Sequence, residues 1–204
     1  MDTTKLKKNA KRLDTLFKVL QKIILISMVV AVCIFLVLTI ANAIDPNVII
    51  GEALHEIDIG PITITLAEGY TPNNNRILTY GWILLSLGGA SAAVTYYAFD
   101  CIRKILQSVI QENPFYASVG KHIRKIGYVC VALGIVENAA GILETHNLFQ
   151  NYGLLNLLNS TLISNITVNY QLDFTFIILF FVLYLLSYIF EYGAKLQQLS
   201  DETL

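Results

Sequence analysis

Four long apolar segments constrain this chain more than any other feature of its sequence. They cover residues 23–44, 77–99, 126–143 and 174–190, and none contains Lys or Arg. A helix needs roughly 20 apolar residues to cross a hydrocarbon layer of about 30 Å, and the first segment would extend about 33 Å. Only 14% of the residues are charged, against about 25% in a typical soluble domain. We therefore predict an all-α membrane protein, one domain over residues 1–204 with four transmembrane helices.

The basic residues predict the orientation of these helices. All Lys and Arg residues except Arg76 fall in residues 1–22, 100–125 and 191–204. Segments on the cytoplasmic side of a membrane carry an excess of Lys and Arg. We therefore expect both termini in the cytoplasm, and residues 45–76 and 144–173 as external loops.

The end of the first apolar segment admits a second interpretation. Ala41-Asn42-Ala43 matches the A-x-A pattern at which signal peptides are cleaved. The apolar run before it has about 20 residues, whereas the apolar core of a signal peptide has about 7–15. This length favours an uncleaved anchor helix.

Helical patterning continues beyond the apolar segments. Residues 6–20 place leucines at helical spacing between lysines, which predicts one helix from about residue 4 into the first span. Residues 102–110 show the same spacing. Asn113-Pro114-Phe115 then combines a good N-cap with Pro at the first helical position. We predict a cytoplasmic helical hairpin that turns at residues 112–114, and a helix that continues over residues 192–199 after the fourth span.

The sequence of the first predicted external loop favours a small β-hairpin and gives no support for a metal site. Residues 61–66 alternate between apolar and polar side chains, as in a strand. The nearby acidic and histidine side chains could collect a divalent ion, but Ile59 stands where H-E-x-x-H requires its second His. A solvated acidic loop is the better interpretation, and we expect no cofactor. The side chains in question are Glu52, His55, Glu56 and Asp58.

Glu137, followed by Asn138, is the one ionisable residue well inside a predicted span. An acidic residue at mid-membrane costs roughly 2.5–3.5 kcal/mol, and such residues often mark a proton or ion pathway. Alternatively, Glu137 reaches the outer interface, because it lies six residues from Leu143. Both interpretations stay open.

Two further patterns concern the packing of the spans. Tyr184, Tyr188 and Tyr192 share one helix face and could line a ligand path, or they could pack near the interface. Small residues at 88–93 suit close helix contact. We expect their partners among the small residues at 134–141.

The helix after Pro114 is amphipathic. Phe115 begins its apolar face, and the opposite face carries Lys121, Arg124 and Lys125. These faces could pack only within the protein, could lie on anionic lipid, or could dock a cytoplasmic partner. No Gly-rich phosphate loop and no G-x-S-x-G motif occurs in the sequence, so we do not expect an enzyme.

Two segments of this sequence carry a family resemblance. They are residues 189–204 (IFEYGAKLQQLSDETL) and the Asn113-Pro114-Phe115 motif followed by residues 121–127 (KHIRKIG). Both are similar to the bacterial membrane family called domain of unknown function 2975, whose four-span layout agrees along nearly the whole chain. The resemblance implies a bacterial cytoplasmic membrane. It also implies a regulatory partner, because many members are encoded beside a small helix-turn-helix regulator of the Cro/C1 type.

Three functional hypotheses follow. The first is an interaction protein whose cytoplasmic helices bind a small DNA-binding regulator, with no direct contact to nucleic acid. Its candidate residues are Phe115, Lys121, Arg124 and Lys125. The second is a small transporter or an immunity-type protein, with Glu137, Asn138 and the three tyrosines along its path. The third is a structural subunit of a membrane complex.

Overall fold

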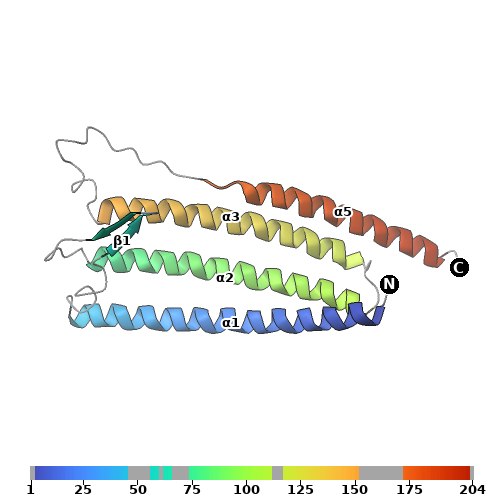
Figure 1. The fold of residues 1–204 in the computed structure, drawn as a ribbon, viewed down its shortest axis with the longest axis horizontal. Helices are drawn as coiled ribbons and strands as arrows, with labels where there is room; N and C mark the ends of the chain where they lie inside the picture. The colour runs from blue at the N-terminus through green and yellow to red at the C-terminus, as the bar shows by residue number, and fades with distance from the viewer. Residues whose placement is uncertain are drawn as a thin grey trace. The chain divides into compact units, whose positions relative to one another are not determined.

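Within the residues that it describes, the computed structural model has four long helices and one pair of short strands (Figure 1). The described residues are 3–45, 56–59, 62–65, 74–111, 117–151 and 172–202. The helices are α1 (Thr3–Ile44), α2 (Asn74–Ile110), α3 (Ala117–Asn151) and α5 (Thr175–Glu202). The strands are β1 (Glu56–Ile59) and β2 (Ile62–Thr65).

The large apolar side chains of these helices lie mostly at the surface. Ile26 of α1 is 63% exposed and Ile178 of α5 is 68% exposed. Soluble proteins rarely expose apolar surface on this scale, whereas lipid tails cover it without cost. All four helices are long and apolar enough to cross a membrane. A helix also satisfies its own backbone hydrogen bonds, as a membrane-spanning segment must.

The helices extend beyond the apolar segments from which they were predicted. α1 is continuous over 42 residues, which confirms one helix from about residue 4 into the first span. α5 continues to Glu202, as predicted after the fourth span. The predicted turn at residues 112–114 lies outside the described residues. α3 continues to Asn151, past the predicted end of its span at Leu143, because the onset of polar residues marks a membrane boundary and not a helix end.

β1 and β2 pair antiparallel, with Glu56 opposite Thr65 and Ile59 opposite Ile62. The alternating pattern at residues 61–66 predicted a strand at this place. Of the side chains considered for metal binding, Glu52 and His55 lie outside the described residues.

Contacts divide the chain into two units. The second unit comprises residues 29–87 and 140–171. In it, the Trp82 indole N–H of α2 donates to the Thr39 hydroxyl of α1 over 3.0 Å. The Phe35 ring meets the Trp82 ring edge-on, with centroids 5.8 Å apart. A buried indole N–H needs such an acceptor, so this contact fixes how α1 and α2 pair within the unit.

The first unit comprises residues 1–28, 88–139 and 172–204. In it, α1 packs on α2 through the Phe17 and Phe99 rings, whose centroids lie 5.2 Å apart. Gly89 of α2 lies against the Met28 side chain of α1.

Glycines on α3 accommodate α5 in the same unit. Gly120, Gly127 and Gly134 are buried and lie seven residues apart, on one face of the helix. A Cβ atom at Gly120 would lie 2.8 Å from the Ser187 carbonyl oxygen, and one at Gly134 would overlap the Phe176 ring. The backbones of α3 and α5 therefore approach as closely as they do only because these positions lack a side chain.

This packing corrects the predicted partners of two of the small residues, Gly89 and Gly134. We expected the small residues of α2 to meet those of α3, but Gly89 faces Met28 of α1 and Gly134 faces Phe176 of α5. Glycines here receive large side chains, whereas the prediction paired small residue with small residue. Spacing alone identifies a close-contact face and leaves its partner helix open.

Candidate functional site

A polar network joins α1 to α2 in the first unit. The Arg103 guanidinium donates from Nε to Asp14 over 2.9 Å and from Nη1 to the Gln21 side-chain oxygen over 2.9 Å. Gln21 is buried, and its amide nitrogen donates to the Tyr96 backbone oxygen over 3.2 Å. Both the nitrogen and the oxygen of the buried Gln21 amide are thereby hydrogen-bonded, as burial beside apolar helices requires.

This network was not predicted from the sequence, although a signal for it exists. Asp14 is the one acidic residue between residues 3 and 44, and it stands among lysines. Gln21 follows it after two helical turns, so both lie on one face of α1. An isolated acid and an amide at this spacing indicate a cationic partner on a neighbouring helix.

A second polar cluster joins α3 to α5. Arg124 forms an ion pair with Glu191, in which both side chains are less than a third exposed. The guanidinium carbon also lies 5.8 Å from the centroid of the Tyr184 ring and 5.6 Å from that of Tyr188. The two tyrosine hydroxyls are 3.2 Å apart. The cluster thus combines a charged hydrogen bond with cation–π contacts.

The structure brings together residues that the sequence placed in separate hypotheses. Arg124 was a candidate for partner binding, and Tyr184 and Tyr188 were candidates for a ligand path, yet the three contact one another. Tyr192 is exposed. Phe115 lies outside the described residues.

The three basic residues of α3 have different surroundings. Arg124 faces α5, whereas Lys121 and Lys125 are both exposed, and Lys125 also lines a groove beside α2. A helix turns by about 100° per residue, so neighbours such as Arg124 and Lys125 need not share a face. Of the basic face predicted from the sequence, Lys121 and Lys125 are therefore exposed, while Arg124 is turned toward α5.

Asn138 binds the segment that leads into α5. Its side-chain nitrogen donates to the Asp173 carbonyl oxygen over 2.8 Å, and its side-chain oxygen accepts from the Asp173 N–H over 2.9 Å. Asp173 in turn caps α5, because its carboxylate accepts from the hydroxyl and from the backbone N–H of Thr175. These hydrogen bonds hold the pKa of the Asp173 carboxyl below its usual value.

Glu137 is exposed, unlike its neighbour Asn138. Within the described part of the chain, no hydrogen bond or ion pair to Glu137 occurs. Asn138 has a packing role, and no described contact joins Glu137 to the tyrosines of α5. The described residues also contain no group of three His, Cys, Asp or Glu side chains able to hold a metal ion.

Two ion pairs in this unit thus join neighbouring helices, while many large apolar side chains face outward. Four membrane-spanning helices with this distribution define a multi-pass membrane protein. A family model described as Protein of unknown function (DUF2975) matches residues 65–204, and the chain belongs to that family. This membership confirms the resemblance seen in the sequence. Among curated proteins and among solved structures, nothing matches the chain.

Proposed function

We propose that this protein is an interaction protein of a bacterial cytoplasmic membrane, with both termini in the cytoplasm. Its cytoplasmic helix ends bind a small soluble partner, such as a helix-turn-helix regulator. The orientation is supported by the Lys and Arg residues, all of which except Arg76 fall in the segments assigned to the cytoplasm. The choice of partner is supported by the family resemblance given above.

The length of α1 supports a docking role. Its 42 residues correspond to about 63 Å of helix, whereas a bilayer with its headgroup regions is about 40–45 Å thick. The apolar span begins at Ile23, so the excess lies before it, on the side assigned to the cytoplasm. A helix that only anchors the chain would not need this extension.

The observation that carries the proposal is the apolar strip on this extension, formed by Leu6, Leu13 and Leu16. These leucines are 42%, 45% and 50% exposed, although they precede the span and would face water. Lysines lie on the adjacent face. An amphipathic face of this kind typically pairs with a helix or groove of a partner protein. The small helical domain of a regulator would supply such a surface.

The test is recovery of the partner from the native host. The tagged protein is extracted in a mild detergent, and bound proteins are identified by mass spectrometry. Beside it we would run Leu13→Glu with Leu16→Glu, which places charges in the strip. Thr15→Glu is the matched control, because Thr15 is exposed on the same turn outside the strip.

We expect to recover a small regulator with the parent and with Thr15→Glu. The variant with both leucines changed to Glu should not recover it. Equal recovery from all three proteins would refute the role of the strip. Recovery of no soluble partner with the parent would refute the proposed function.

A further inference from the structure

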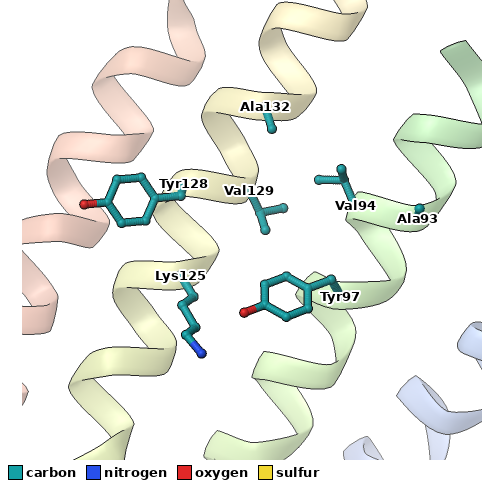
Figure 2. A pocket seen from close by; sticks show the side chains of 7 residues that line it. All are labelled: Ala93, Val94, Tyr97, Lys125, Tyr128, Val129 and Ala132. Atoms are coloured by element: carbon teal, nitrogen blue, oxygen red, sulfur yellow. The ribbon is translucent and has the colours of Figure 1, made fainter.

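A groove lies between α2 and α3 in the first unit (Figure 2). Its volume is about 450 Å³, within the range of about 300–1,000 Å³ that is typical of sites for small ligands. Small side chains on both helices leave this space open. The lining residues are Ala93, Val94 and Tyr97 of α2, and Lys125, Tyr128, Val129 and Ala132 of α3.

The chemistry of the groove changes along its length. Val94, Val129 and Ala132 form an apolar end, whereas the Tyr97 hydroxyl and the Lys125 ammonium group point toward the other end (Figure 2). The Tyr128 ring turns toward α5, where its centroid lies 5.5 Å from that of Phe180. One end of the groove therefore suits hydrocarbon and the other suits an anion.

The position of the groove along the chain matches a membrane boundary. Val129 and Ala132 lie inside the third apolar segment, and Lys125 directly precedes it. Tyrosine is enriched where the hydrocarbon meets the headgroups. A soluble partner would not reach the apolar end, because lipid surrounds it.

The charges near Lys125 favour an anion. Among the described residues, no acidic side chain pairs with Lys125. Lys121 is exposed one helical turn before it. Asp100 lies at the same end, but its carboxylate pairs with Lys104 over 2.6 Å. The net charge of the side chains around Lys125 is therefore positive.

We propose that this groove binds an anionic phospholipid. The phosphate lies at Lys125, within reach of the Tyr97 hydroxyl, and an acyl chain follows Val94, Val129 and Ala132. In the orientation proposed above, the groove opens in the cytoplasmic leaflet, whose surface is negative because of its anionic lipids. The groove would thus bind an anionic phospholipid of the cytoplasmic leaflet, and this binding does not require a soluble partner.

The test measures lipid retained by the purified full-length chain. The protein in detergent is mixed with phosphatidylglycerol and phosphatidylcholine of identical acyl chains, and bound lipids are counted by native mass spectrometry. The variants are Lys125→Gln, which removes the charge, and Ala132→Phe, which fills the apolar end. Lys22→Gln is the matched control, because Lys22 is an exposed lysine at the boundary of the first span.

We expect the parent to retain phosphatidylglycerol in preference to phosphatidylcholine. Lys125→Gln should lower that preference about tenfold, because it removes a charge-assisted hydrogen bond to the phosphate that Lys22 does not make. Ala132→Phe should lower retention of both lipids, and Lys22→Gln should match the parent. If Ala132→Phe does not fold, the comparison of Lys125→Gln with Lys22→Gln still decides the proposal.

Three outcomes would overturn the proposal. If the parent retains both lipids equally, the groove has no site for an anion. If Lys22→Gln and Lys125→Gln lower the preference for phosphatidylglycerol equally, the lipid is attracted by positive charge in general and not by a site at Lys125. A dimer of the parent that Ala132→Phe dissociates, with lipid retention unchanged, would show that a second copy fills the groove.

Discussion

The ion pair between Arg124 and Glu191 should be a main determinant of how α3 holds α5. Both side chains are less than a third exposed, at 29% and 28%, so water screens the pair only in part. A hydrogen bond to a charged group contributes about 1.5–3 kcal/mol. The contacts of Arg124 with Tyr184 and Tyr188 add about 0.5–1 kcal/mol.

A double-mutant cycle measures this interaction. Arg124→Met, Glu191→Gln and the double variant are compared with the parent by equilibrium unfolding in mixed micelles, followed by circular dichroism. We expect each single change to lower the free energy of unfolding by about 1.5–3 kcal/mol. The double variant should lose less than the sum, with a coupling of about 1 kcal/mol or more. Lys121→Met, on the same helix but exposed, should stay within about 0.5 kcal/mol of the parent.

Additive effects within about 0.3–0.5 kcal/mol would refute this reasoning, because independent sites behave in that way. The result also bears on partner binding. A charge reversal at Arg124 would break the contact with α5, so loss of a partner in that variant would not locate a docking surface.

Three further predictions follow from the same unit. Gly120→Ala should destabilise the protein by about 1–3 kcal/mol, because its Cβ would lie 2.8 Å from a backbone oxygen. Gly88→Ala, at a position with open space around it, is the control in the same unfolding assay. Equal effects of the two changes would contradict the close approach of α3 and α5. Asn138→Leu should speed hydrogen exchange in the first turn of α5, since it removes two hydrogen bonds to Asp173; unchanged exchange would show that Asn138 does not hold that segment. Because the pKa of Asp173 is lowered in the folded chain, its contribution to stability is complete above the ordinary Asp value and is lost as the pH falls through the lower folded value. The thermal stability of the parent should therefore approach that of Asp173→Asn as the pH falls from about 5, and a difference independent of pH would contradict the cap.

The number and type of the main elements could be predicted because their cause is local. A run of apolar residues such as 23–44 requires a lipid-facing helix whatever its neighbours are. Leucines at helical spacing likewise placed the start of α1 near residue 4, and α1 begins at Thr3. These inferences need only the order of residues along one helix.

The pairing of side chains could not be predicted, because it depends on which helices meet. Arg124 and Glu191 lie far apart in the chain, and the sequence around either residue does not indicate that the other is its partner. The sequence assigned Arg124 to an outer basic face, but its side chain turns inward to α5. Asn138 was noticed for its polarity, while its partner is a backbone segment that has no sequence signature.

In the part of the chain that the structure describes, two ion pairs join helices that follow each other in the sequence. Asp14 and Arg103 connect α1 to α2, and Arg124 and Glu191 connect α3 to α5, in each case outside the apolar spans. A chain is synthesised from its N-terminus, and contacts between neighbouring elements form early. Each of these partly exposed charges therefore meets its counter-ion once the next helix is in place. The protein can be assembled as two successive helical hairpins, and neither needs a charged partner from the other for these two ion pairs to form.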